Sequence, residues 1–172
     1  EIENFAELKK QLPDCTFLSE TDSEVIPHLI ESFINTGKTF YEAFRLTLLK
    51  LKGSFAIACL NTKTGDVYAA TNGPSLVVGE MEGEFFLASD VVGFLKHTNS
   101  AVYLQPGEMV VLSEKPDYYS FKTNNPIEKK SELLEWSVNE TNKGFFEHFM
   151  MKEIHEQPDN LRRILEHYVS NN

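Results

Sequence analysis

The side chains best suited to chemistry gather in one short stretch, Ser19-Glu20-Thr21-Asp22, between a β-like run at 16–18 and an apolar-periodic segment. Ser, Thr and Asp side chains accept hydrogen bonds from the free N–H groups of a helix's first turn, and acidic groups suit its positive end. One interpretation is therefore that Asp22 caps the adjoining helix. The other is that its carboxylate, at the end of a strand, meets the ammonium group of a ligand in a cleft. This stretch alone supports both.

No other group of residues supplies a complete catalytic set. The sequence has no GxSxG elbow, Walker loop, GxGxxG fingerprint or HExxH motif. His148 and His155 are spaced for a surface or interface role rather than for metal ligation. Ser54 and Ser89 lie at strand boundaries, but the sequence places no His to activate either. These residues by themselves indicate only an α+β domain with an acidic junction.

The composition fits one soluble domain. The chain has 172 residues, of which 41% are hydrophobic, enough for a sizeable core. Its net charge of −10 argues against nucleic acid and against a membrane as partners, because both need a basic face. No apolar run approaches the roughly 20 residues of a membrane span, and the first ten residues do not resemble a signal peptide. These features predict a cytoplasmic protein.

The two cysteines offer no recognisable redox or metal motif. Neither Cys15 nor Cys59 has a CxxC partner. Cys59 lies in an apolar run and is expected to be a small buried core residue. A disulfide is not expected in a cytosolic chain.

The order of apolar periodicities predicts helices first, then strands, then helices again. A helix over 22–35 is expected to bury Val25, Ile26, Leu29 and Ile30 on one face. The expected helices cover 4–11, 22–35, 39–50, 91–96, 144–158 and a last segment that Asp159 caps after Pro158 stops the chain. The expected strands cover 53–60, 67–71, 75–79, 84–89, 101–104, 109–112 and 118–122. This order predicts a layered α+β domain with a mostly antiparallel sheet set.

Five segments carry a resemblance to a known family. They occur in the order TFLSETDSEVIPHLI, GSFAIACL, AATNGPSLVVGEMEGEFFLASD, VYLQPGEMVVL and GFFEHFMMKEIHEQPDNLRRIL. Together they resemble the glutaminase domain (glutamine amidotransferase type 2) of the glutamine–fructose-6-phosphate aminotransferases, which make glucosamine 6-phosphate. The SETDSEV segment is shared with other N-terminal-nucleophile amidotransferases, whereas EHFMMKEIHEQP is more specific to the sugar-phosphate enzymes.

The resemblance implies a fold and a domain organisation. The fold would be the N-terminal-nucleophile hydrolase-like α/β/β/α sandwich, incomplete at the N-terminus. Residues 1–143 would form a partial glutaminase domain, and residues 144–172 a helical linker toward an absent sugar-phosphate isomerase domain. The resemblance implies no metal and no organic cofactor, because a cysteine and backbone donors do the chemistry in this family.

The resemblance also assigns the acidic junction. The aspartate of SETD holds the α-amino group of glutamine in this family, and Asp22 occupies that position; Ser19 and Thr21 keep the capping role. The family's N-terminal cysteine nucleophile, its Arg-Trp-x-Thr-His stretch and the Asn-Gly pair of its oxyanion hole are not found, because Glu1-Ile2-Glu3-Asn4 resembles the residues immediately after that pair. We therefore expect a fragment that is inactive alone. The alternative is a degenerate, non-catalytic regulatory or interaction domain.

The expected partners derive from these assignments. They are glutamine, bound together with the missing N-terminal segment, and the sugar-phosphate isomerase domain. Self-association into a homo-oligomer is also expected, because absent strands would leave open sheet edges and the apolar run 145–151 would lack its partner. Neither nucleic acid nor a membrane is expected.

Overall fold

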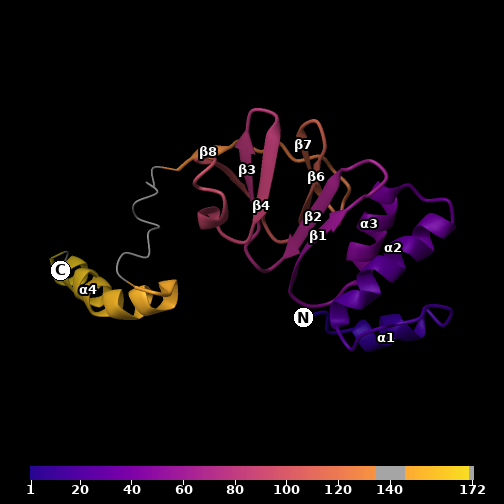
Figure 1. The fold of residues 1–172 in the computed structure, drawn as a ribbon, viewed down its shortest axis with the longest axis horizontal. Coiled ribbons are helices and arrows are strands. Elements are labelled where there is room, and N and C mark those ends of the chain that lie inside the picture. The colour runs from indigo at the N-terminus through magenta and orange to yellow at the C-terminus, as the bar shows by residue number, and fades with distance from the viewer. Residues whose placement is uncertain (135–145, 171–172) are drawn as a thin grey trace. The chain divides into compact units, whose positions relative to one another are not determined.

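The computed structural model describes residues 1–134 and 146–170, which belong to two compact units, Glu1–Glu135 and Trp136–Asn172 (Figure 1). Among the described residues, those of the first unit form three α-helices and two sheets, and those of the second form one long helix. The boundary expected between residues 143 and 144 lies outside the described residues.

The helical layer of the first unit consists of α1 (Phe5–Lys10), α2 (Val25–Asn35) and α3 (Phe40–Lys50). The helix α2 buries the face that its periodicity predicts, Val25, Ile26, Leu29 and Ile30. The helix α3 buries a matching face, Ala43, Phe44, Thr47 and Leu48. These two faces meet in one core with Tyr68, Ala70 and Met109. The periodicity of both helices is therefore explained by their packing on a sheet.

Two antiparallel four-stranded sheets come after the helices. The first has the order β1-β2-β6-β7 and the second the order β4-β3-β5-β8. The strands are β1 (Phe55–Leu60), β2 (Val67–Asn72), β3 (Val77–Met81), β4 (Glu84–Ala88), β5 (Ser100–Tyr103), β6 (Glu108–Leu112), β7 (Pro116–Ser120) and β8 (Glu132–Leu133). The seven strands expected from the sequence are confirmed with shifted ends, whereas the sequence does not predict β8.

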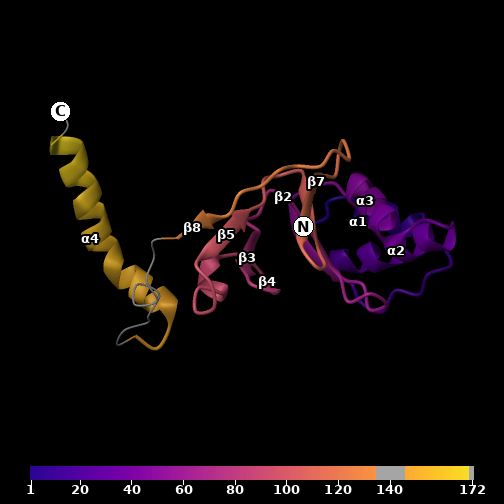
Figure 2. The same ribbon diagram turned by 90° about the horizontal axis from the view of Figure 1, so that it is seen from above.

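The two sheets stack face to face, and the helices cover the other face of the first sheet. In Figures 1 and 2 these layers follow one another from the helices on the right to the second sheet on the left. Along β2, Tyr68 and Ala70 face the helical core, and Ala69 faces the second sheet. The same alternation places Met109 of β6 under the helices and Val110 between the sheets. Two stacked antiparallel sheets below a helical layer confirm the predicted α+β sandwich architecture.

Within residues 1–134, the outer face of the second sheet is covered by a short turn, η2 (Val91–Gly93), rather than by an α-helix. Phe94, directly after this turn, lies against Gly79 of β3, where a Cβ atom would be 2.6 Å from the ring. The expected helix over 91–96 is thus a 3-10 turn that places one aromatic ring on a glycine in the sheet.

The second unit contains α4 (Phe149–Ser170). Pro158 lies inside this helix, so the expectation that Pro158 ends one helix and Asp159 caps another is wrong. Proline in a helix interior removes one backbone donor without forcing the chain to stop. Asp159 instead pairs with Arg162, at 2.7 Å between Oδ1 and Nη1. None of the helices in the described residues is long and apolar enough to cross a membrane.

Candidate functional site

The acidic junction forms an irregular loop that enters α2 through a 3-10 turn, η1 (Asp22–Glu24). The side chain of Thr21 makes no capping hydrogen bond, and neither does that of Glu24, the residue before α2. The hydroxyl of Ser19 accepts a hydrogen bond from the N–H of Thr21, which lies outside the helix. The prediction that Ser19 and Thr21 cap α2 is therefore wrong, as is the interpretation of Asp22 as its N-cap.

Asp22 reaches toward the start of the chain instead. Its Oδ2 accepts a hydrogen bond from the N–H of Ile2 at 2.6 Å. The side chain is half-buried, and its Oδ1 makes no hydrogen bond to any other described residue. The carboxylate thus joins the start of α2 to the first residues of the chain with one oxygen and keeps the other available.

The first four residues are held along the segment that leads into β1. Ile2 is buried and bridges to Gly53, and the N–H of Glu3 donates to the carbonyl of Lys52 at 3.0 Å. The side-chain amide of Asn4 donates to the carbonyl of Lys50 and accepts from the N–H of Lys52, both at 2.9 Å. This backbone pairing fixes the N–H that Asp22 binds.

Gly53 makes that close approach possible. Its φ of +104° lies in the left-handed region that side chains disfavour, and a Cβ atom there would overlap the carbonyl oxygen of Glu1. Its own carbonyl accepts a hydrogen bond from the side-chain amide of Asn72 at 2.8 Å. The glycine therefore sets the distance between the start of the chain and the first sheet.

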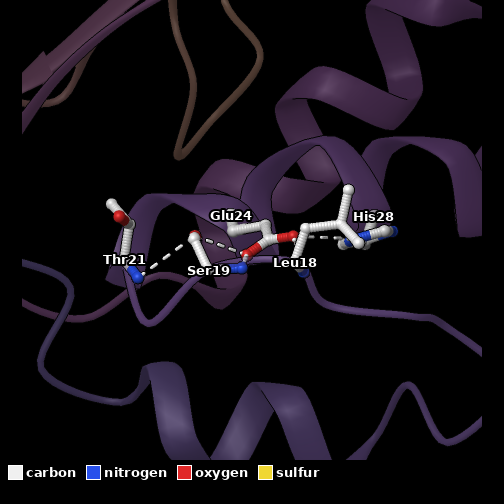
Figure 3. A network of polar contacts seen from close by, with 5 residues as sticks. All are labelled: Leu18, Ser19, Thr21, Glu24 and His28. Carbon is white, nitrogen blue, oxygen red and sulfur yellow. Dashed lines mark hydrogen bonds and ion pairs between the residues drawn. The ribbon is translucent and has the colours of Figure 1, made fainter.

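Glu24 is the centre of a polar network that closes the loop (Figure 3). Its carboxylate accepts hydrogen bonds from the N–H of Leu18 at 2.7 Å, the N–H of Ser19 at 2.8 Å and the hydroxyl of Ser19 at 2.6 Å. His28, one turn further along α2, lies 3.9 Å from the same carboxylate. These contacts, led by the Ser19 hydroxyl and the Leu18 N–H, lower the pKa of Glu24 to about 2.

The network also corrects the β-like run expected at 16–18. Those residues form no strand, because the N–H groups of Leu18 and Ser19 are bound by a carboxylate rather than by a neighbouring strand. Phe17 fixes the start of the loop, with its ring 4.6 Å from that of His28 and 4.5 Å from the Nζ of Lys9. Sequence reasoning missed Glu24, although its position three residues after Thr21 was a visible signal.

The other candidate residues do not join this site. Both cysteines carry free thiols and pack half-buried against the core, so Cys59 is less buried than expected. Burial still raises the pKa of Cys59, which favours its unreactive protonated form. His155 stacks on Phe146 with ring centroids 5.1 Å apart. Within residues 1–134 and 146–170, no three His, Cys, Asp or Glu side chains are grouped to hold a metal ion.

A groove of about 440 Å³ lies beside the site, between the start of α2 and the outer edge of the first sheet. It is lined by Ser23, Ile26 and Pro27 and by the whole of β1 except its first residue. In the described residues β1 pairs only with β2, so its other edge is open. Apart from Ser23, the lining side chains are apolar, and unpaired backbone groups of β1 border the groove.

Comparison with known proteins connects this geometry to a family. A family model described as a glutamine amidotransferase domain matches residues 1–96. The glutamine–fructose-6-phosphate aminotransferase (isomerizing) of Methanothermobacter thermautotrophicus is 42% identical over 95% of this chain, and that of Thermococcus kodakarensis is 44% identical over 91%. These matches cover 28% and 27% of the relatives, so the chain spans less than a third of their length.

Solved structures lead to the same conclusion. The glutamine phosphoribosylpyrophosphate amidotransferase of B. subtilis, in complex with ADP and GMP, has a TM-score of 0.57 and 28% identity, covering 69% of this chain and 27% of its own. A structure described as the allosteric regulatory enzyme of purine biosynthesis also has a TM-score of 0.57. The α+β fold is therefore that of the N-terminal-nucleophile amidotransferases. Since the family model matches more than half of the residues, the chain belongs to the glutamine amidotransferase domain family.

Proposed function

We propose that this chain is part of the glutamine-hydrolysing domain of an aminotransferase that forms glucosamine 6-phosphate from glutamine and fructose 6-phosphate. The identity of more than 40% to two aminotransferases over nearly the whole chain supports the proposal. Residues 1–143 would belong to the glutaminase domain, and 144–172 would lead to a sugar-phosphate isomerase domain. The exposed apolar side chains of α4, such as Met150, Leu161 and Leu165, suit a contact with such a domain.

The observation that carries the proposal is that only one oxygen of the Asp22 carboxylate accepts a hydrogen bond from the described residues. One oxygen binds the N–H of Ile2, and the other is available for the ammonium group of glutamine. A charge-assisted hydrogen bond of this kind contributes about 1.5–3 kcal/mol. The same carboxylate would thereby bind the substrate and hold the first residues of this chain in place.

We propose that neither cysteine of this chain is the nucleophile of the reaction. Both thiols are half-buried against the core, and the raised pKa of Cys59 disfavours its thiolate. We therefore propose that glutamine binds jointly with a preceding segment that supplies an N-terminal cysteine. No metal is assigned a part in this proposal.

Two assays test the proposal. The full-length protein that carries this chain should make glucosamine 6-phosphate from glutamine and fructose 6-phosphate, whereas the 172-residue chain alone should release no ammonia from glutamine. Glutamine-saturable ammonia release by the chain after alkylation of both thiols would contradict the assignment of the nucleophile. A full-length protein that binds glutamine without hydrolysing it would favour a regulatory domain instead.

The same isolated chain tests the expected homo-oligomer. The open edge of β1 and its apolar groove suit a second copy of the chain. We expect size-exclusion chromatography with light scattering to give a mass above that of a monomer. A monomer at high concentration would contradict this part of the proposal.

A further inference from the structure

The loop between Leu18 and Asp22 is held in place by polar contacts rather than by burial. The side chain of Leu18 is 90% exposed, and the next three residues are exposed as well. Apolar packing therefore does not fix this part of the backbone. The contacts that do are the three hydrogen bonds accepted by Glu24 and the one between the Thr21 N–H and the Ser19 hydroxyl.

In the chain, Glu24 and the residues that it binds lie on opposite sides of Asp22. Glu24 belongs to η1, whose position is set by the buried Val25 and Ile26 at the start of α2. Its hydrogen bonds return to Leu18 and Ser19. These hydrogen bonds close the backbone from 18 to 24 into a ring. Contacts on both sides of Asp22 in the chain therefore restrict its position.

These bonds do nothing for the helix itself. None of the donors bound by Glu24 belongs to the first turn of α2; two are loop N–H groups and one is a loop hydroxyl. A carboxylate that served the helix would bind the N–H of Thr21, as in a capping box. The contacts of Glu24 therefore stabilise the loop and not the N-terminus of α2.

We propose that Glu24 is a positioning residue, which holds the 18–22 loop so that Asp22 keeps one oxygen on Ile2 and turns the other toward the substrate ammonium. This inference rests on the proposed role of Asp22. Glu24 itself touches neither substrate nor reacting atoms; it acts through the placement of Asp22. An ionised carboxylate suits this task because three donors converge on it, and an amide would turn its NH₂ group toward one of them.

The test is a double-mutant cycle in the full-length protein, with glutamine KM as the readout. Glu24→Gln should raise the glutamine KM by about fivefold, as for the loss of one hydrogen bond, with kcat at saturating glutamine within about twofold of wild type. In an Asp22→Asn background the same substitution should change KM by less than about twofold, because the charge that Glu24 positions is already gone. Glu42→Gln, on α3, is the matched control and should leave the glutamine KM unchanged.

The outcomes separate this inference from the proposed function. An unchanged glutamine KM in Asp22→Asn would overturn the role of Asp22 itself. If Asp22→Asn raises KM while Glu24→Gln does not, or if the two effects multiply in full, the positioning role of Glu24 is wrong and that of Asp22 stands. Should Glu24→Gln fail to fold, Ser19→Ala decides, because it removes one donor to Glu24 together with the acceptor of the Thr21 N–H and should raise KM by at least about fivefold.

Discussion

Two helices of this domain begin with the same four-residue pattern, Thr-x-x-Glu, and use it in opposite ways. At α3, the hydroxyl of Thr39 accepts a hydrogen bond from the N–H of Glu42, and the carboxylate of Glu42 accepts one from the N–H of Thr39 at 2.9 Å. This is a complete capping box. At α2, the side chain of Thr21 makes no such bond, and Glu24 binds Leu18 and Ser19 instead.

The difference shows what each helix needs from its first turn. The helix α3 closes its own N-terminus with its side chains, whereas α2 starts through a 3-10 turn and buries Val25 and Ile26 at once. Because the burial of Val25 and Ile26 fixes the start of α2, the polar side chains before it can bind elsewhere. Glu24 binds the loop, and Asp22 binds the N–H of Ile2. A capping pattern that remains unused by its helix can therefore mark a binding junction.

The largest expected effect comes from removing the charge of Asp22. Asp22→Asn keeps an oxygen that can accept from Ile2 but cannot pair with an ammonium group. In the full-length protein, glutamine KM should rise by about 10- to 100-fold, as for the loss of one charged hydrogen bond. Ammonia-dependent synthesis, if the protein has it, should not change. An unaltered glutamine KM would show that the junction before α2 has a structural role only. The two Thr-x-x-Glu patterns would then not differ in substrate binding.

The next effect concerns the helix ends themselves. Thr39→Ala should destabilise the first turn of α3 by about 1 kcal/mol, seen as about fivefold faster amide hydrogen exchange there. Thr21→Ala should leave exchange in the first turn of α2 unchanged within about twofold, because its hydroxyl makes no capping bond. Equal effects at the two threonines would mean that both patterns work as caps.

The smallest effect is a difference in acid sensitivity. The pKa of Glu24 is lowered to about 2, so its contribution to stability is complete above its ordinary value of 4.5 and is lost as the pH falls from 4.5 to 2. Glu24→Gln should therefore destabilise the protein above pH 4.5, and this difference from wild type should shrink as the pH approaches 2. Urea unfolding at a series of pH values measures it. A difference that stays constant with pH would show that Glu24 does not titrate with folding.

Glu42 offers the matching measurement at α3. Its hydrogen bonds to Thr39 also lower its pKa, so Glu42→Gln should show a pH dependence of the same sign. What separates the two glutamates is the glutamine KM, which only Glu24 should alter.

The regular elements of this fold could be predicted from sequence because local chemistry decides them. The buried face of α2, the cap-type Thr39 of α3 and the hairpin of β1 and β2 are all indicated by periodicity and turn residues. The strand β8 could not be predicted, since its two residues pair with β5 through contacts distant in sequence. The prediction that Pro158 ends a helix was wrong because an interior proline makes a helix less stable but does not exclude it.

The candidate site was predictable only in part. Asp22 stood out by residue type and by family resemblance, and its contact to Ile2 has no local signal because it joins segments twenty residues apart. The role of Glu24 was hidden by its own pattern, which predicts a capping box equally well. Local sequence cannot tell which N–H groups a flexible carboxylate will reach; that depends on how the burial of α2 orients its first turn.

The sheet order has a consequence for the folding of the protein during its synthesis on the ribosome. In β2, Val67 lies opposite Leu112 of β6, and the strands β3, β4 and β5 of the other sheet are all encoded between them. At about 5–20 residues per second, synthesis of that interval takes several seconds. Throughout this time the hairpin of β1 and β2 has no neighbour at β2's second edge. The nascent chain must therefore carry an unfinished apolar sheet for seconds before the two sheets can close on each other.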